Sequence, residues 1–472
     1  MELSVTILDP LDFDGREGET MNTHQANVTE VYGGYHLRDV PPEDAELTHV
    51  GPGTPCGEYM RKFWQPVCLS QELTDLPHAI RILGEDLVAF RDKSGDVGVL
   101  HRHCSHRGTS LEYGIVVEHG IRCCYHGWLF GTDGTILETP GEPPNSKLRE
   151  SFRHGAYPAR EYEGLVFAYM GLPEEEPAFP LFDTYYLADN KLVPYSCHYS
   201  CSWLQVHENF VDPIHAVFLH TRLTGTQFTD AWHDLPATEF IEKDAGLYYI
   251  TTRQVNDRIW VRTNHIMLPN FGQVAALWEA VEKEKFFNRA SVTRWSVPID
   301  DINSWIFGFR HFNDVVDTAG IGKEEECGID SVDFLGQTGN RPYEERQREP
   351  GDWDALVGQR QIAIHAKEHL GTTDRGVAMW RKILREGIRG ENRFSAKPAT
   401  WGYDGDPIHT YTHDTCLEIP DNGMKGAEQM EYLAKVGRDV LDCVFSGDVF
   451  EGIERKAHIE QKLITLRDRY CT

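Results

Sequence analysis

Residues 101–128 read HRHCSHRGTSLEYGIVVEHGIRCCYHGW and place two pairs of metal-binding side chains on two short segments. The first segment carries Cys104 and His106, and the second carries Cys123 and His126, with sixteen residues between the two pairs. Zinc fingers that use two cysteines and two histidines usually place both cysteines on one loop and both histidines on a helix. Here each segment combines one cysteine with one histidine. This arrangement favours a [2Fe–2S] cluster in which two thiolates bind one iron and two imidazoles bind the other.

The sequence around these segments has the pattern of short β-strands separated by turns. Apolar runs such as IRILGEDLVAF (80–90) and WLFGTDGTIL (128–137) are broken by glycine and aspartate, which favour tight turns. We therefore predict a small all-β domain over residues 51–173, preceded by an N-terminal arm over residues 1–50. Prolines and acidic residues in GLPEEEPAFP (171–180) indicate a linker.

The rest of the chain, residues 181–472, has the pattern of a second domain. Strand-like runs are followed by longer helical patterns, which is typical of an α+β fold with helices packed on one face of an antiparallel sheet. The fold class that we predict is α+β, with a small all-β domain joined to a helix-grip-like catalytic domain. The predicted strands cover residues 246–255, 258–268, 290–299 and 304–312, helices are predicted near 203–220, 353–370, 374–386 and 426–445, and residues 314–350 are predicted to form a long loop.

A second group of metal-binding side chains lies in CSWLQVHENFVDPIHAVFLHT (201–221). Two histidines and one carboxylate bind Fe(II) in mononuclear oxygenases and leave positions open for O₂ and substrate. His215 and His220 supply two imidazoles, but their spacing of five residues separates them by about 140° on an ideal helix. They can therefore meet only at a bulge or at a helix end. Two histidines at this spacing, taken alone, are more often core or surface residues than metal ligands. Glu208 and Asn209 are candidates for the same pocket, and an ordinary solvated position is the equal alternative for both.

Together, the two groups of side chains resemble a known family. CSHRG and CCYHGW resemble the paired Rieske motif, with Cys124 where most members have proline. The segment from Asp212 to His220 resembles the Asp-x2-His-x4-His signature that follows the Rieske domain in ring-hydroxylating oxygenases. Over residues 55–385 the chain thus resembles the oxygenase component of Rieske non-haem iron oxygenases, in the branch of phthalate dioxygenase.

The resemblance implies a role for each of these side chains. It implies that the loop side chains bind the [2Fe–2S] cluster, with Cys123 rather than Cys124 as a ligand because only Cys123 has the family's spacing to His126. It also implies that Asp212 connects an iron-binding histidine to His126 of a neighbouring subunit, which requires a head-to-tail homotrimer. The implied ligands are Cys104, His106, Cys123 and His126 for the cluster, and His215 and His220 for a mononuclear Fe(II).

A third iron ligand is implied by EHLGTTD (368–374). This element is similar to a motif of the phthalate dioxygenase branch, in which the ligating aspartate lies sixteen residues before the glutamate. Counting back from Glu368 leads to Asp352. Asp354 is the alternative ligand. Either aspartate also fits the N-terminal end of a helix, where the helix dipole favours a carboxylate, and this would explain the one that does not bind iron.

The resemblance also implies a reaction and its partners. The chain contains no G-x-G-x-x-G or Walker motif, so electrons from NADH are expected through a separate reductase of the flavin or ferredoxin type. The expected reaction uses O₂ to hydroxylate or O-demethylate an aromatic substrate, either an aromatic acid or an aryl ether.

Two other classes of protein share part of the pattern. A Rieske electron-transfer protein without oxygenase activity would carry the cluster alone and would leave residues 181–472 unexplained. Respiratory members also have an additional cysteine beside each cluster loop, where this chain has Thr109 and Tyr125. A structural zinc protein is the third possibility.

Charge and cysteine content bear on the partners and the compartment. The chain has 46 basic and 74 acidic residues, and a net charge of −28 disfavours binding to nucleic acid or to an anionic membrane. No apolar run approaches the ~18 residues of a membrane helix. Eleven cysteines in 472 residues are too few for a disulfide scaffold, so we expect reduced thiols and a cytoplasmic protein.

Substrate-binding residues have weaker signals. Arg262 and Arg310 lie in strand-like runs and could pair with a substrate carboxylate, although ordinary salt bridges explain such arginines more often. The segment WGYDGDPIHTYTHD (401–414) is a candidate cover for the pocket. The candidates for an apolar pocket, for which core packing is the alternative, are Trp203, Phe218, Met267, Trp305 and Phe307.

Overall fold

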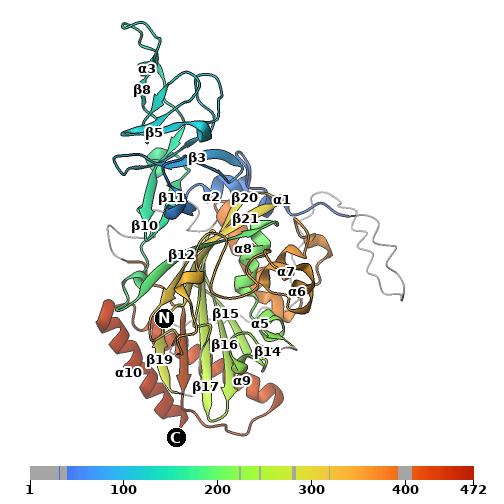
Figure 1. The fold of residues 1–472 in the computed structure, drawn as a ribbon. Helices are drawn as coiled ribbons and strands as arrows, with labels where there is room; N and C mark the ends of the chain where they lie inside the picture. Colours follow the sequence, from blue (N-terminus) through green and yellow to red (C-terminus); the bar gives the residue numbers. More distant parts are fainter. Residues whose placement is uncertain are drawn as a thin grey trace.

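The computed structural model describes residues 31, 40–222, 225–243, 246–278, 283–317, 319–391 and 407–472. Figure 1 shows a β-rich part, drawn in blue and teal, that projects from a larger part in which helices surround a long sheet. The described strands pair antiparallel within both parts, which confirms the predicted α+β class.

The β-rich part contains three antiparallel sheets among the described residues. The first pairs β1 (Trp64–Leu69) with β11 (Leu165–Tyr169) and β10 (Ala159–Tyr162). The second has the order β2 (His78–Ile82), β3 (Glu85–Arg91), β4 (Val97–His101) and β9 (Ala156–Tyr157). The third has the order β5 (Ile115–Val117), β6 (Gly120–Arg122), β7 (Leu129–Phe130) and β8 (Ile136–Glu138). Three short helices accompany them: α1 (Ala45–Thr48), α2 (Pro55–Met60) and α3 (Leu148–Ser151).

The larger part is built on one antiparallel sheet. Its main path is β12 (Lys191–Tyr199), β21 (Asn303–Phe312), β20 (Val292–Asp300), β18 (Phe271–Val274), β17 (Arg258–Met267), β16 (Gly246–Val255) and β15 (Ala237–Lys243). In addition, β22 (His413–Leu417) pairs with β17 and with β19 (Lys285–Asn288), and β13 (Thr221–Arg222) pairs with β14 (Gly225–Thr226). The four strands predicted from sequence correspond to β16, β17, β20 and β21.

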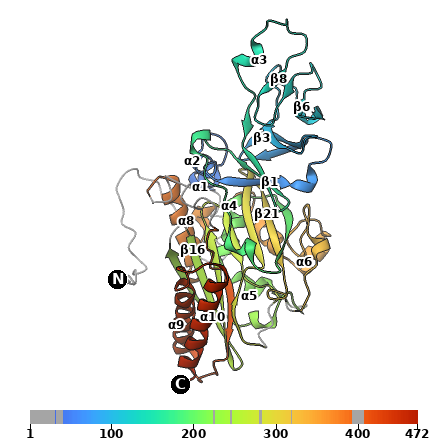
Figure 2. The same ribbon diagram turned by 90° about the vertical axis from the view of Figure 1, so that its left-hand side faces the viewer.

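Helices pack on both faces of this sheet, so the prediction that they cover one face alone is wrong. Along β16, Tyr248 and Ile250 belong to the core under α9 (Gly426–Phe445), whereas Leu247 and Tyr249 belong to the core that includes α8 (Arg375–Ile388). Because side chains alternate along a strand, these two cores lie on opposite faces. Figure 2 shows α10 (Gly452–Tyr470) beside α9. The sequence analysis did not predict α10, most of whose residues are polar or charged.

The helix predicted near residues 203–220 is divided in two. It consists of α4 (Trp203–Glu208), a 3₁₀ turn η6 (Asn209–Val211) and α5 (His215–Leu219). Asp212 has extended backbone angles, φ −112° and ψ 91°, because Pro213 follows it and disfavours the helical conformation at the preceding residue. α4 and α5 are therefore separate helices, whereas the sequence pattern predicted one continuous helix.

The helix predicted near residues 353–370 is also shorter than expected. α7 (Asp352–Val357) ends before Gly358, and Arg360 has a positive φ of 86°, which a helix does not allow. The predicted loop over residues 314–350 contains α6 (Tyr343–Arg348). The remaining 3₁₀ turns are η2 (Ser70–Glu72), η3 (Leu111–Tyr113), η4 (Pro173–Glu175), η5 (Asp183–Tyr186), η7 (Asp230–Trp232), η8 (Glu324–Glu326), η9 (His365–Lys367) and η10 (Thr372–Asp374).

None of the helices in the described part of the chain is long and apolar enough to cross a membrane.

Candidate metal centres

The two loops that carry the Cys–His pairs have the same backbone geometry. In each loop the cysteine N–H donates to the carbonyl five residues later, at 2.9 Å for Cys104 and 2.8 Å for Cys123. The N–H groups of Gly108 and Gly127 donate back to the two cysteine carbonyls at 2.8 and 3.0 Å. Both glycines have left-handed angles, φ +77° and +73°, that favour glycine. The loops are thus matched halves of one site.

The side chains of these loops converge. Cys104 and Cys123 are each 3% exposed, and the rings of His106 and His126 lie 4.5 Å apart between centroids. Burial, with a further contribution from Cys123, raises the pKa of Cys104 to about 11. The His106 Nδ1 atom is buried without a hydrogen-bond partner in the described structure. Neighbouring thiols and an unpartnered imidazole nitrogen fit a cluster with mixed ligands.

Cys124 differs from its neighbour Cys123. Cys124 is exposed, whereas Cys123 is buried beside Cys104. The structure therefore brings Cys123, not Cys124, into the group of four side chains.

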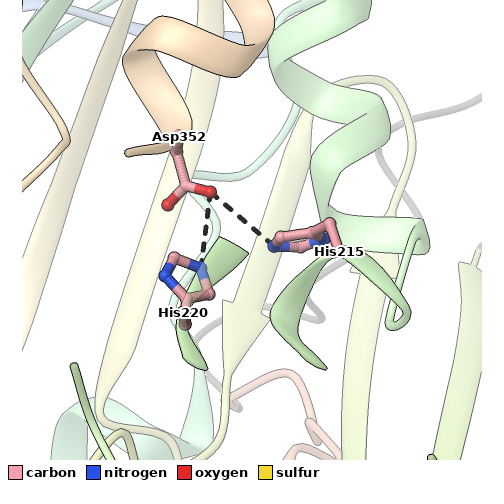
Figure 3. Close-up of side chains that lie close together, drawn as sticks. All are labelled: His215, His220 and Asp352. Atoms are coloured by element: carbon pink, nitrogen blue, oxygen red, sulfur yellow. Dashed lines mark ion pairs between the residues drawn. The ribbon is translucent and has the colours of Figure 1, made fainter. Parts of the chain in front are cut away.

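A second group of three side chains meets in the larger part of the molecule (Figure 3). His215 begins α5, His220 directly follows its last residue, and Asp352 begins α7. The Asp352 Oδ1 atom lies 3.7 Å from His215 Nε2 and 3.5 Å from His220 Nε2. Ligand atoms of all three residues lie within 4.8 Å of one another. The end of α5 at Leu219 is what allows two histidines five residues apart to converge.

Neighbouring groups orient each of these side chains. The His215 Nδ1–H donates to the Asp212 backbone carbonyl, and His220 Nδ1 lies 3.0 Å from the Gln227 Oε1 atom. Such contacts select the tautomer that leaves Nε2 free for a metal. The Gln337 amide donates to Asp352 Oδ2. No motif signals Gln227 or Gln337, and the sequence analysis missed both.

The electrostatics of the group favour a metal-binding state. Burial opposes ionisation of Asp352, but the His220 and His215 imidazoles and the Gln337 amide hold the pKa of Asp352 well below its usual range. Burial also lowers the pKa of His215, which favours a neutral imidazole. An ionised carboxylate and a neutral imidazole are the forms that bind Fe(II).

Of the two pocket candidates that precede the histidines, only Asn209 lies at this site. Its amide nitrogen is 3.2 Å from both His215 Nε2 and Asp352 Oδ1. Glu208 instead forms a two-contact ion pair with Arg381, at 2.5 and 2.8 Å. The prediction that Glu208 lines the pocket is therefore wrong.

The remaining two aspartates have different surroundings. The Asp212 Oδ1 atom accepts hydrogen bonds from the N–H groups of Ile214 (3.0 Å) and His215 (3.3 Å), and its side chain is 34% exposed. The Asp354 carboxylate pairs with Arg341 at 2.6 Å and with Arg346 at 3.3 Å. The structure thus brings Asp352, not Asp354, to the histidines.

A cavity of about 70 Å³ lies beside this group. It opens between the sheet and the segment that carries the histidines. Its polar lining includes Asn209, Tyr249, Thr251, Arg253, Arg262 and Arg294, and its apolar lining includes Phe228, Trp232, Val274, Leu277, Val292 and Phe334.

Several predictions about the pocket are corrected by this lining. Arg262 lines the cavity, but Arg310 does not. The Nε and Nη2 groups of Arg310 donate to Asp333 at 2.6 and 2.9 Å, and its Nη1 donates to the Ser291 carbonyl. Of the five predicted apolar residues none lines the cavity: Phe218 is 70% exposed, Trp203, Met267 and Phe307 are buried in the core, and Trp305 packs against it. Residues 401–406 of the predicted cover lie outside the described residues, and residues 407–414 lead into β22 instead of lining the cavity.

Comparison with known proteins identifies the family. The family model of the Rieske [2Fe-2S] domain matches residues 63–156. The tert-butanol monooxygenase / tert-amyl alcohol desaturase oxygenase subunit of Aquincola tertiaricarbonis is 46% identical over 452 residues, which cover 92% of this chain and 96% of that protein. The chain belongs to the Rieske oxygenases. Another relative, the phenoxybenzoate dioxygenase subunit alpha of Ectopseudomonas oleovorans, is 38% identical and covers 73% of this chain and 84% of its own length.

Solved structures share the Rieske oxygenase fold at lower identity. Dicamba monooxygenase bound to 3,6-dichlorosalicylic acid has a TM-score of 0.53 at 18% identity and covers 70% of this chain and 98% of its own. NdmA of Pseudomonas putida CBB5 with caffeine also has a TM-score of 0.53, at 19% identity, and covers 71% of this chain and 93% of its own. These two likenesses concern the fold alone.

Family membership decides between the classes considered from sequence. Relatives that match most of this chain are oxygenase subunits, so the chain is an enzyme subunit of a Rieske mono- or dioxygenase rather than an electron carrier or a zinc protein. The Rieske domain and the oxygenase relatives support a [2Fe–2S] cluster and iron as its metal centres.

Proposed function

We propose that Cys104, His106, Cys123 and His126 hold the Rieske cluster and that His215, His220 and Asp352 hold the mononuclear iron. When bound, the cluster supplies electrons and the iron activates O₂ beside the substrate. The observation that carries this proposal is the set of ligand atoms within 4.8 Å of one another at the wall of a cavity. The chain's own residues prepare the site by keeping Asp352 ionised and by aiming both Nε2 atoms inward.

Asp212 is proposed as the link between the two centres. Its carboxylate is fixed by two N–H groups at the start of α5, lies 3.7 Å from His215 Nδ1 and remains partly exposed. A carboxylate that touches a ligand histidine on one side and is open on the other can accept a second imidazole from outside.

That second imidazole is proposed to be His126 of a neighbouring subunit in a head-to-tail homotrimer. Both views place the sheet of β5 to β8, which carries the cluster loops, at the far end of the molecule from α5. Exposed aromatic side chains lie on both surfaces: Tyr113 and Tyr125 near the cluster, 67% and 58% exposed, and Phe218 on α5. Exposed apolar groups of this kind support a protein interface.

The electrons are proposed to come from NADH through a separate flavin- or ferredoxin-containing reductase. This part of the proposal rests on the absence of a nucleotide-binding motif in the sequence. A cytoplasmic location is proposed as well, because none of the eleven cysteines is paired in a disulfide, which suits a reducing compartment.

The proposed substrate is an aromatic compound. The aromatic wall formed by Phe228, Trp232 and Phe334 supports this choice, as does the name of the relative that acts on phenoxybenzoate. The relative named for tert-butanol and tert-amyl alcohol acts on aliphatic alcohols, so those alcohols belong in the same test.

The test is a substrate screen with the iron-loaded protein, NADH and a surrogate reductase. Aromatic acids, aryl ethers and tertiary alcohols are supplied singly, and O₂ uptake is measured together with the product mass in ¹⁸O₂. We expect substrate-dependent O₂ uptake and a product that gains labelled oxygen or loses a methyl group. Absence of any O₂-dependent product, from a preparation with both metal centres loaded, would contradict the proposed function.

A further inference from the structure

Two hydroxyl side chains of β16 line the cavity beside the proposed iron site. Tyr249 and Thr251 are two residues apart, so their side chains lie on the same face of the sheet, and both belong to the cavity wall. Their exposed fractions are 8% and 3%. Buried polar groups in proteins nearly always form hydrogen bonds, so the partners of these two hydroxyls indicate what the cavity can hold.

The hydrogen bonds around Tyr249 determine the role of its hydroxyl. Asn264 is buried and lies opposite Tyr249 in the register of β16 and β17. The Ala275 N–H donates to Asn264 Oδ1 at 3.0 Å, which fixes the orientation of the amide. The Asn264 Nδ2 group therefore donates to the Tyr249 hydroxyl oxygen. The hydroxyl is thus an acceptor toward Asn264, and its own proton is left for a different partner.

The hydroxyl proton of Tyr249 has no acceptor among the described residues, where the contact with Asn264 is its one hydrogen bond. Burial raises the pKa of Tyr249, so the hydroxyl keeps its proton at neutral pH and can donate it in a hydrogen bond. The Thr251 Oγ1 atom is buried as well and has no hydrogen-bond partner in the described structure. Two hydroxyl groups with unused hydrogen-bonding capacity therefore line the same cavity.

We propose that Tyr249 donates a hydrogen bond to an ether or hydroxyl oxygen of the substrate, with Thr251 as a second contact for that group, and that this pair determines specificity. The inference rests on the proposed oxygenase function and adds the chemical class of its substrate. A phenolic hydroxyl presents a single proton, and an ether or hydroxyl oxygen presents the lone pairs that accept it.

The position of Tyr249 relative to the metal ligands explains how such a contact would orient the substrate. His215, His220 and Asp352 line the same cavity, which has a volume of about 70 Å³. In a cavity of this size, an oxygen held at Tyr249 fixes one end of the substrate. Only a limited part of the carbon skeleton can then lie beside the proposed iron ligands, which is how a binding contact selects the position that reacts.

The test measures binding by calorimetry under nitrogen, with both metal centres loaded. Two matched pairs of probes differ mainly in one oxygen: anisole against ethylbenzene for an ether, and phenol against toluene for a hydroxyl. The oxygen preference is the Kd of the hydrocarbon divided by the Kd of the oxygen compound. Because a hydrocarbon leaves water more readily, the preference of the wild type is compared with that of each variant.

Tyr249→Phe removes the hydroxyl and keeps the ring. It should lower the oxygen preference by about threefold or more, because the lost hydrogen bond contributes at least about this factor, and binding of the two hydrocarbons should not weaken. Tyr248→Phe is the matched control, since Tyr248 lies on the opposite face of β16, where its ring stacks on His265 with centroids 4.3 Å apart.

The outcomes for Tyr249→Phe are separate. A decrease for one pair of probes alone supports the proposal and identifies the oxygen group as an ether or a hydroxyl. A decrease of less than about threefold for both pairs, or an equal decrease in Tyr248→Phe, overturns the proposal.

Thr251→Val is a second variant that keeps the shape of the side chain. It should lower the preference for phenol over toluene, because a bound hydroxyl can also donate to Thr251 Oγ1, and it should affect anisole less. If Tyr249→Phe does not fold, Thr251→Val decides the question: loss of the preference for phenol supports the proposal, and an unchanged preference overturns it.

The two proposals fail in distinguishable ways. Failure of the substrate assignment leaves iron content and O₂-dependent turnover intact, while the oxygen preference does not depend on Tyr249. Failure of the oxygenase proposal appears as missing mononuclear iron or missing product, whichever probe binds.

Discussion

At the scale of single residues, the second centre depends on groups that hold its ligands as much as on the ligands. The Asp212 carbonyl and the Gln227 side chain orient the two imidazoles, and Gln337 orients Asp352. Contacts of this type fix the tautomer of a ligand histidine and the rotation of a ligand carboxylate. The centre is therefore prepared by the fold before a metal binds.

Asp352→Ala should remove the mononuclear iron and leave the cluster in place. Among the described residues, the substitution deletes the one carboxylate that lies within 4 Å of both imidazoles. Iron should fall from about three to about two atoms per chain while the absorption spectrum of the cluster persists. Asp354→Ala is the matched control, since Asp354 pairs with Arg341 instead. Loss of iron in Asp354→Ala but not in Asp352→Ala would show that Asp354, and not Asp352, is the third iron ligand.

Asp212→Asn should slow electron transfer without loss of either metal. Asparagine retains an oxygen that can accept the N–H groups of Ile214 and His215, so the start of α5 is preserved. The negative charge that joins two imidazoles is removed. Stopped-flow measurement of cluster oxidation in the presence of substrate should show a large decrease in rate. An unchanged rate would remove Asp212 from the electron path.

At the scale of elements, one ion pair shows how the cluster domain is held together. Glu85 on β3 accepts hydrogen bonds from Tyr157 at 2.6 Å and from Arg61 at 2.9 Å. Burial opposes its ionisation, but contacts from His101, Tyr157 and Arg61 outweigh it and lower the pKa of Glu85 to about 2. This carboxylate links the end of α2 to β3 and β9.

Glu85→Gln should therefore destabilise the protein in a pH-dependent manner. A carboxyl pKa lowered from 4.5 to about 2 corresponds to about 3 kcal/mol of the free energy of unfolding. Because the folded-state pKa is depressed, this stability is present above pH 4.5 and is lost as the pH falls toward 2. Urea unfolding of both proteins should show the full difference at pH 7 and 5 and about half of it at pH 3.

A surface pair provides the control for this measurement. Glu138 pairs with Arg122 at 2.7 Å, but its side chain is 51% exposed. Glu138→Gln should change stability by less than about 1 kcal/mol at each pH. A difference between wild type and Glu85→Gln that does not vary with pH would show that its origin is packing rather than charge.

Sequence reasoning located the elements with strong periodicity, and motif spacing indicated which side chains the fold brings together. The alternating runs of β16 and β17 and the spacing of Cys104, Cys123 and their histidines belong to this class. It failed where a single residue changes the backbone: Pro213 divides the helix near residues 203–220, and Arg360, with a positive φ of 86°, interrupts the helix predicted near residues 353–370.

The cavity lining could not have been predicted in the same way. Arg262, Arg294 and Phe334 come from two strands and a loop, and only the pairing of the sheet brings them together. Arginine at a strand position has no signal that separates a cavity residue from a buried ion pair. This is why Arg262 and Arg310 looked alike in the sequence, although Arg310 pairs with Asp333.

At the scale of the whole molecule, the proposed electron path crosses a subunit boundary. Light scattering should give a particle of about three times the 53.9 kDa chain mass. A sharper test co-expresses Asp352→Ala, which lacks the mononuclear site, with Cys123→Ser, which lacks a cluster ligand. Each variant alone should be inactive, and mixed trimers should regain turnover because an intact cluster in one subunit serves an intact iron in the next. Inactive mixed trimers would place the path within one subunit.

The most direct test of the central claim is the metal and sulfide content of the purified wild-type protein. A Rieske cluster together with a mononuclear site predicts about three iron atoms and two acid-labile sulfides per chain. Two iron atoms with two sulfides, in a preparation supplied with excess Fe(II), would contradict the claim that His215, His220 and Asp352 form an iron site, and zinc without sulfide would contradict both metal assignments.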